Sequence, residues 1–362
     1  MSVAYAYLDH NATSPLRPVA FDAMVEALNA GGNPSSVHRL GRAARARIDK
    51  ARRQVADLVG AVPAEVVFTS GGTEANNIAL RGHPRVLVSA VEHESVLKAV
   101  PDAERIPVDG NGLIDLAALE RLLANGPALV SVMFANNETG VIQPIADAVR
   151  LARAAGTLVH CDAVQAAGKV PVDLHGLGVD YLSLSAHKLG GPTGVGALIV
   201  RGGAPLATDR FGGGQESWRR AGTENVSGIA GFGAAAEASR NGLDAALRDR
   251  LEASLPGRIH GAAAPRLPNT TCISMPGVKA ETQVMAFDLA GVAVSAGSAC
   301  SSGKVTRSAV LTAMGVEASE AETAIRISCG WNTVFDEIEL LIAAWQGLYT
   351  RLRQSDISLR AA

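Results

Sequence analysis

The sequence lacks the features that mark membrane or nucleic-acid-binding proteins. No run of about 18 uncharged apolar residues occurs, so no membrane-spanning helix is expected. The formal net charge is -2, and Lys and Arg are scattered among the acids, which argues against a basic surface for nucleic acid. The N-terminus has no basic region followed by an apolar stretch. We therefore expect a cytoplasmic protein with no membrane and no nucleic-acid partner.

Cysteine is also scarce. The 4 cysteines, Cys161, Cys272, Cys300 and Cys329, are far apart, with no C-x-x-C pair and no His at zinc-binding spacing. This spacing predicts neither a disulfide framework nor a metal site. Each cysteine is, by default, a small buried hydrophobic residue.

The composition is that of a large α/β protein. At 362 residues, the chain exceeds the size at which one hydrophobic core usually stops growing, which favours a large and a smaller domain. Hydrophobic residues make up 48% of the chain and charged residues 19%, with only 7 Phe. These values are typical of a soluble protein rich in Ala, Gly, Val and Leu.

Short β-branched runs alternate with helical patterns over about the first two thirds of the chain. The pattern predicts strands at 65–69, 85–90, 129–134, 157–161, 181–185 and 195–200, and helices at 18–28, 42–59, 74–80, 116–123, 145–154 and 227–238. Such alternation predicts a mostly parallel sheet covered by helices on both faces, with ligands beyond the carboxyl ends of the strands. The later segment predicts a second, α+β domain, with a boundary near residue 250.

The stretch S-G-G-T-E-A-N-N, Ser70 to Asn77, follows one of these strands and opens a helical pattern. Backbone N–H groups and a Thr hydroxyl at a helix N-terminus can hold an anion such as phosphate. Neither the Walker loop nor the dinucleotide-binding glycine pattern is present. The alternative interpretation is an ordinary helix with Thr73 as its N-cap.

Two further strand ends carry groups that suit a pyridoxal cofactor. In H-C-D-A-V-Q, Asp162 can pair with a cationic ring nitrogen, although it can also be a helix N-cap. In L-S-A-H-K-L-G-G-P, Lys188 can form a Schiff base with a carbonyl, although a single lysine is more often a solvated surface residue. Three complementary sites at strand ends favour the cofactor interpretation. His93 and Asn137 follow two other strands.

Together, these stretches resemble a known family. T-S-G-G-T-E-A-N-N, V-E-H-E-S-V, N-N-E-T-G, H-C-D-A-V-Q-A-A-G-K, S-A-H-K-L-G-G-P, R-A-G-T-E-N and S-A-G-S-A-C-S-S-G are similar to motifs of the pyridoxal-phosphate-dependent cysteine desulfurases. This family belongs to the class V aminotransferase-like proteins, and the resemblance is to the branch that serves nitrogenase and iron–sulfur cluster assembly. The cysteine loop alone makes the match specific for desulfurases.

The resemblance implies an α/β fold, the aminotransferase-like fold type I. It has a large, mostly parallel seven-stranded sheet domain, 14–250, and a smaller α+β domain, 1–13 plus 251–362, which carries the cysteine loop. The implied cofactor is pyridoxal 5'-phosphate and the implied substrate L-cysteine. A homodimer and a sulfur-acceptor protein, such as an iron–sulfur scaffold, are also implied. No metal is implied.

The resemblance also implies a role for each matching residue. Lys188 is joined to the cofactor, Asp162 pairs with the pyridine nitrogen, Gln165 bonds the phenolic oxygen and His93 stacks on the ring. Arg326 clamps the substrate carboxylate with help from Asn137, a planar geometry that Lys could not reproduce. The phosphate is held by Gly72, Thr73, Ser185 and His187, and by Thr223 from a second subunit.

Cys300 is the candidate nucleophile. Its surroundings, V-S-A-G-S-A-C-S-S-G-K at 294–304, are almost all small residues, which suits a thiol that must approach a substrate sulfur and then carry it away. The expected product is a persulfide, with alanine released. Thr193 and Ala309 depart from the family pattern, where Lys and His are common. The alternatives are a selenocysteine lyase or another class V enzyme, and a non-catalytic binding platform.

Overall fold

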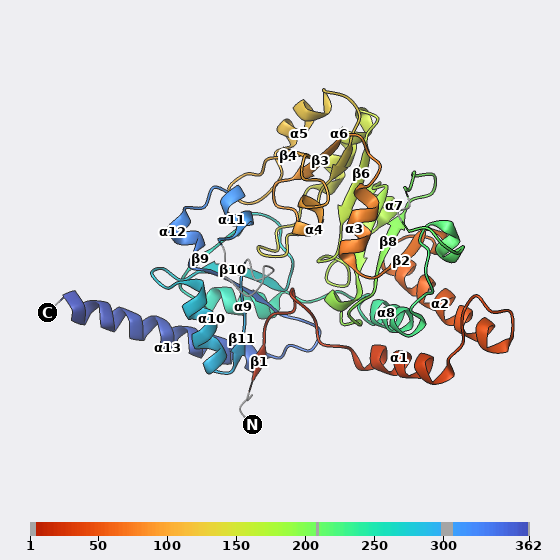
Figure 1. The fold of residues 1–362 in the computed structure, drawn as a ribbon. Helices are drawn as coiled ribbons and strands as arrows, with labels where there is room; N and C mark the ends of the chain where they lie inside the picture. The colour runs from red at the N-terminus through yellow and green to blue at the C-terminus, as the bar shows by residue number, and fades with distance from the viewer. Residues whose placement is uncertain (1–4, 208–209, 298–306, 361–362) are drawn as a thin grey trace.

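The computed structural model describes residues 5–207, 210–297 and 307–360. Its centre is a seven-stranded sheet in the order β2-β8-β7-β6-β5-β3-β4 (Figure 1). This sheet confirms the α/β class and the mostly parallel seven-stranded core. The strands are β2 (Val66–Thr69), β3 (Val86–Ser89), β4 (Glu104–Ile106), β5 (Leu129–Ser131), β6 (Leu158–Asp162), β7 (Tyr181–Ser185) and β8 (Gly196–Val200).

The strand directions bring six carboxyl ends to one edge of the sheet. β7, β6, β5, β3 and β4 pair in parallel, in that order. β8 is antiparallel to both of its neighbours, so β2 points the same way as β7. The loops that follow β2, β3, β5, β6 and β7 therefore begin at this edge, where open α/β sheets bind ligands.

Alternating side chains give the sheet two apolar faces. Val66 and Phe68 join the core beneath α2 and α8, whereas Val67 packs on the opposite face with α3. Both faces need helical cover, and the alternating pattern of the sequence supplies it. The helices are α1 (Pro18–Ala30), α2 (Arg39–Leu58), α3 (Gly72–Leu80), α4 (Glu94–Leu97), α5 (Leu116–Leu123), α6 (Ile145–Ala154), α7 (Leu174–Leu177) and α8 (Val226–Ala238), with 3-10 turns η1 (Pro63–Glu65), η2 (Ala186–Lys188) and η3 (Gln215–Trp218).

A second core is built by both ends of the chain. β1 (Ala6–Tyr7) pairs in parallel with β11 (Val292–Ala293), and a four-stranded sheet has the order β12-β13-β10-β9. Its strands are β9 (Arg258–Ile259), β10 (Thr270–Ser274), β12 (Ser295–Ala296) and β13 (Ala324–Ser328). The helices beside it are α9 (Ala246–Ser254), α10 (Ala280–Leu289), α11 (Ala309–Ala313), α12 (Ala318–Ala321) and α13 (Phe335–Arg360), the last of which extends away from the body in Figure 1. The domain limits at residues 14 and 250 stay a prediction.

The edge strand β4 was not predicted by the sequence pattern. Its residues Glu104 and Arg105 are polar, and an edge strand needs only one pairing partner. Within the described residues, no helix is long and apolar enough to span a bilayer, and no cluster of His, Cys, Asp and Glu is suited to a metal ion.

Candidate active site

A cavity of about 310 Å³ lies where the loops at the carboxyl edge of the large sheet meet the small sheet. Most of the candidate residues line it, although they come from six separate segments of the chain. They are Gly72, Thr73, His93, Asn137, Asp162, Gln165, Ser185, His187, Lys188 and Arg326. The strand directions of the large sheet explain the convergence of five of these segments, because each lies at or after a carboxyl end on the same edge, whereas Arg326 comes from the small sheet.

Lys188 ends the 3-10 turn η2, directly after β7. Its Nζ donates hydrogen bonds to the backbone oxygens of Asn11 at 2.6 Å and Ala12 at 2.7 Å. The side chain is half-buried and lines the cavity, which differs from the solvated surface lysine of the alternative interpretation. These carbonyl acceptors hold the amine at the cavity wall.

The loop after β2 brings a helix N-terminus to the cavity. α3 begins at Gly72, its N-cap is Gly71, and no side chain caps it. The interpretation of Thr73 as the N-cap is therefore wrong, because Thr73 is the second residue of the helix. A Cβ atom at Gly72 would lie 2.8 Å from Cγ2 of Val164, so only glycine fits this approach. Backbone N–H groups and the Thr73 hydroxyl are left to face an anion.

Ser185 and His187 extend this anion-binding corner from the end of β7. Burial, and then the charge of Lys188, lower the pKa of His187 to about 4, so its ring is neutral at physiological pH. Nδ1 of His187 lies 3.1 Å from Oγ1 of Thr13. The ring can therefore serve as a neutral hydrogen-bonding group beside the serine hydroxyl.

Asp162 is the last residue of β6 and is only 6% exposed. Its Oδ2 accepts a hydrogen bond from Nδ2 of Asn76 at 2.7 Å, and its Oδ1 accepts one from the N–H of Val164 at 2.9 Å. Turns at residues 164–169, and not an α-helix, directly follow Asp162. The helix N-cap interpretation is therefore wrong, and the carboxylate faces the cavity instead.

His93 precedes α4 and contacts Ser95 twice. Nδ1 accepts a hydrogen bond from the Ser95 N–H at 3.1 Å and lies 2.8 Å from the Ser95 hydroxyl. Because Nδ1 is an acceptor, a neutral ring carries its proton on Nε2. Burial lowers the pKa of His93 more than the neighbouring Asp162 raises it, which favours this neutral form.

Arg326 reaches the cavity from β13 of the small sheet and is 4% exposed. Its Nη2 donates to Oδ1 of Asp9 at 2.6 Å, and its Nη1 donates to the backbone oxygen of Asn137 at 3.2 Å. Among the described residues its Nε has no hydrogen-bond partner. A buried guanidinium with an unused N–H is suited to a carboxylate ligand.

Two candidate residues do not join this cavity in the described chain. Thr223 lines a separate cavity of about 190 Å³ beside Glu216 and Asn225. Cys300 lies outside the described residues. The other three cysteines are buried, and burial raises the pKa of the Cys329 thiol to about 12 and those of Cys161 and Cys272 above their usual value.

Asn11 and Lys169 belong to the site but were not among the candidates. Asn11 lines the cavity. Lys169 lies behind the cavity wall, and its Nζ donates a hydrogen bond to Oδ1 of Asn11 at 2.7 Å. Lys169 ends the motif H-C-D-A-V-Q-A-A-G-K, and Asn11 belongs to the stretch L-D-H-N-A-T near the N-terminus. The spacing of four positions between Gln165 and Lys169 is the sequence feature that could have indicated their contact.

Comparisons with known proteins agree with this arrangement. The family model for class-V aminotransferases matches residues 6–341. A cysteine desulfurase of Cereibacter sphaeroides is 45% identical, covering 96% of each chain. The structure of a NifS-like protein from Rickettsia africae superposes with a TM-score of 0.89 at 35% identity, covering 96% of this chain and 99% of that one. The structure of SspA in complex with cysteine superposes with a TM-score of 0.80 at 29% identity, covering 91% of this chain and 100% of that one.

These relatives favour a cysteine desulfurase over the selenocysteine lyase and over the non-catalytic platform. The chain belongs to the class-V aminotransferase family and, within it, to the cysteine desulfurases.

Proposed function

We propose that this cysteine desulfurase binds pyridoxal 5'-phosphate in the cavity at the carboxyl edge of the large sheet, converts L-cysteine to L-alanine, and takes the sulfur onto Cys300 as a persulfide. The observation that carries the proposal is the convergence of Lys188, Asp162 and Arg326 on one cavity. The solved relative in complex with cysteine supports the choice of substrate.

The residues present fit the cofactor. The open N-terminus of α3, where Gly72 leaves no room for a Cβ atom, and the hydroxyls of Thr73 and Ser185 suit a phosphate. Asp162, held by Asn76 and the Val164 N–H, suits a cationic ring nitrogen. When bound, pyridoxal 5'-phosphate supplies an aldehyde for an amine and a ring that stores an electron pair.

The chain's own groups then have separate tasks. Lys188 would hold the cofactor through its amine and, when that amine is free, would take up and deliver the substrate's α proton. Arg326 holds the substrate carboxylate with its remaining N–H groups, and Asn137 supports the guanidinium through its backbone oxygen. His93 covers the ring in its neutral form. Gln165 donates to the phenolic oxygen.

Sulfur transfer is assigned to Cys300. Its thiolate attacks the sulfur of the bound cysteine, so that an S–S bond forms as the Cβ–S bond breaks, and Cβ takes a proton to give alanine. Overall, one cysteine and one thiol give one alanine and one persulfide. The burial of Cys161, Cys272 and Cys329 supports this assignment, since none of them can approach a ligand.

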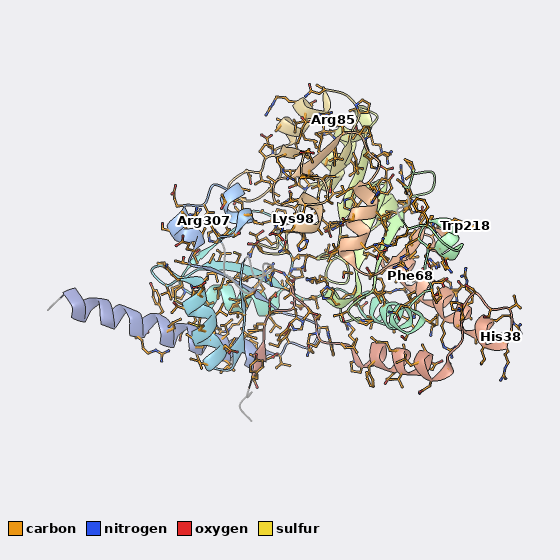
Figure 2. All side chains as sticks on the ribbon, viewed as in Figure 1. His38, Phe68, Arg85, Lys98, Trp218 and Arg307 are labelled. Atoms are coloured by element: carbon orange, nitrogen blue, oxygen red, sulfur yellow. The ribbon has the colours of Figure 1, made fainter. Side chains whose placement is uncertain are left out.

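The second subunit is part of the same proposal. Val19, Phe21 and Leu28 leave α1 with an exposed apolar face, and Trp218 is 75% exposed. Figure 2 shows Trp218 on the same side of the molecule as His38, the residue before α2. Apolar exposure of this kind is typical of a protein interface. A homodimer formed by this face would let Thr223 reach the partner's phosphate site.

The remaining assignments concern the cell. We propose a cytoplasmic enzyme, since its three described cysteines are unpaired, as is usual in a reducing compartment. The persulfide would pass to an acceptor protein such as an iron–sulfur scaffold.

The experiment that tests the function is turnover with L-cysteine and dithiothreitol, together with the visible spectrum. The purified protein should absorb in the visible region and release alanine and sulfide in equal amounts. Lys188→Ala should lose the visible band and the activity, with its fold intact by circular dichroism. An unchanged band in that variant would contradict the cofactor assignment.

A further inference from the structure

Lys169 is a buried lysine beside the active site, and the mechanism described above does not use it. It is 4% exposed, and its Nζ donates to Oδ1 of Asn11 and Oε1 of Gln165, both at 2.7 Å. Within the described residues it forms no ion pair with a carboxylate. A buried ammonium with only neutral partners is costly, which argues for a role at this position.

Lys169, Gln165 and Asn11 form a closed ring of hydrogen bonds, in which Asn11 takes part through both its side chain and its backbone oxygen. Lys169 donates to Gln165 and to Asn11, and Nε2 of Gln165 donates to the backbone oxygen of Asn11 at 2.9 Å. An ammonium can only donate, so the oxygen of the Gln165 amide must face Lys169. The amide nitrogen is thereby turned to the opposite side, where Gln165 lines the cavity.

The same asparagine connects Lys169 to Lys188. The backbone oxygen of Asn11 accepts the hydrogen bond from Nζ of Lys188, while its side-chain oxygen accepts the one from Lys169. The two lysines therefore approach one residue from two sides. Because both side chains contact Asn11, a positive charge on one lysine disfavours protonation of the other.

We propose that Lys169 is a positioning residue of the active site: it orients the Gln165 amide toward the cofactor's phenolic oxygen, and its charge keeps the amine of Lys188 neutral for its reactions. This inference rests on the proposed function, because it assumes that Lys188 is joined to the cofactor.

The surrounding charges support this role. Burial, then Lys188 and then Arg326, lower the pKa of Lys169 well below its usual value. Electrostatic coupling between two groups is mutual, so Lys169 also disfavours the charged form of Lys188. Another titratable neighbour is His10, whose pKa is lowered to about 4 by burial and by Lys169, so it adds no charge at neutral pH. Arg17 and Cys329 also line the small cavity beside Lys169. When Lys188 is neutral, its contribution to lowering the pKa of Lys169 disappears, which favours the charged form of Lys169.

The test is a pH titration of the visible band of the cofactor-loaded protein, which reports the protonation of the Lys188 nitrogen. Lys169→Met removes the charge at similar volume, and its titration midpoint should rise by about one pH unit. Lys169→Arg keeps the charge and should restore the midpoint toward the wild-type value. Lys50→Met, an exposed lysine on α2, is the matched control and should leave the midpoint unchanged.

A second variant decides the matter should Lys169→Met fail to fold. Asn11→Asp places a carboxylate next to Nζ of Lys169 and offsets its charge while the lysine remains, so the midpoint should again rise. A wild-type midpoint in the folded Asn11→Asp or Lys169→Met protein would overturn the inference while leaving the proposed function in place. If the wild-type protein lacks a visible band that depends on Lys188, the proposed function fails, and the inference fails with it.

Discussion

Oε2 of Glu138 accepts a hydrogen bond from the hydroxyl of Ser308, with 2.5 Å between the two oxygens. Glu138 lies on the loop after β5, and Ser308 is the N-cap of α11, so the bond joins the large sheet to the second core. A Cβ atom at Gly297 would lie 2.7 Å from the same carboxylate oxygen. Glu138 therefore lies beside Gly297, which directly precedes segment 298–306, and binds Ser308, the second residue after that segment, which contains Cys300.

This buried carboxyl makes stability depend on pH. Burial, the largest influence, raises the pKa of Glu138 from 4.5 to about 7. The folded protein thus binds the proton more tightly than the unfolded chain does, and its free energy of unfolding falls as the pH rises from 4.5 to about 7. Glu138→Gln removes this dependence, so relative to wild type it should gain up to roughly 3 kcal/mol across that range.

Urea unfolding at both ends of the pH range measures this gain. Glu120→Gln, at an exposed position of α5, is the control and should follow the wild-type pH dependence. If Glu138→Gln and wild type kept the same difference at both pH values, the raised pKa would be wrong.

Replacing Arg326 should weaken substrate binding. Arg326→Lys cannot bond Asp9, Asn137 and a substrate carboxylate at once, because an ammonium lacks the planar fork. Loss of a charge-assisted pair should lower kcat/KM for L-cysteine by roughly 10- to 100-fold, with most of the change in KM.

Arg266→Lys is the matched control for this experiment. The side chain of Arg266 is 8% exposed and binds Glu252 through two hydrogen bonds of 2.7 Å, but it does not line the active-site cavity. We expect it to reduce thermal stability and leave KM unchanged. An equal rise of KM in both variants would assign Arg326 a structural role.

Asp162→Asn should slow removal of the α proton. The amide cannot offer a negative charge to a cationic ring nitrogen, so we expect the rate of α-proton removal to fall by at least about 100-fold. Exchange of the α proton of L-alanine in deuterated water isolates this step, because it needs no sulfur acceptor. Asp180→Asn, which removes a buried partner of Arg153 and Arg201, should change stability and not exchange. Wild-type exchange in Asp162→Asn would refute the assignment.

The α1 face should control assembly. Phe21→Glu and Leu28→Glu place charges in the proposed interface, and we expect them to convert dimer to monomer in sedimentation velocity and to weaken cofactor binding through loss of the partner's Thr223. Leu289→Glu is the control, since Leu289 is 90% exposed on α10 of the second core. Dimers that persist in both α1 variants would place the interface elsewhere.

The sequence predicted the strand-end residues well for a physical reason. Lys188, Asp162 and His93 each lie at or just after the carboxyl end of a short strand, and parallel pairing brings such positions to one edge whatever lies between them. Their mutual proximity could therefore be inferred without long-range contacts.

Contacts made by irregular segments could not be inferred in this way. Asn11 accepts from Lys188 across 177 positions, and it belongs to a turn with no periodic pattern. In the sequence, Lys169 is a polar residue at the end of a motif. Its position beside the active site follows from its burial and from its hydrogen bonds to Asn11 and Gln165. The role of Thr223 depends on a second chain.

The most direct test of the account is the site of the transferred sulfur. After brief exposure to L-cysteine without reductant, tryptic mass spectrometry should find one added sulfur atom on the peptide that contains Cys300, with an equal amount of alanine released. Cys300→Ala should retain the visible band, gain no sulfur and release no sulfide. Sulfur found on Cys161, Cys272 or Cys329, or sulfide released by Cys300→Ala at the wild-type rate, would contradict the account.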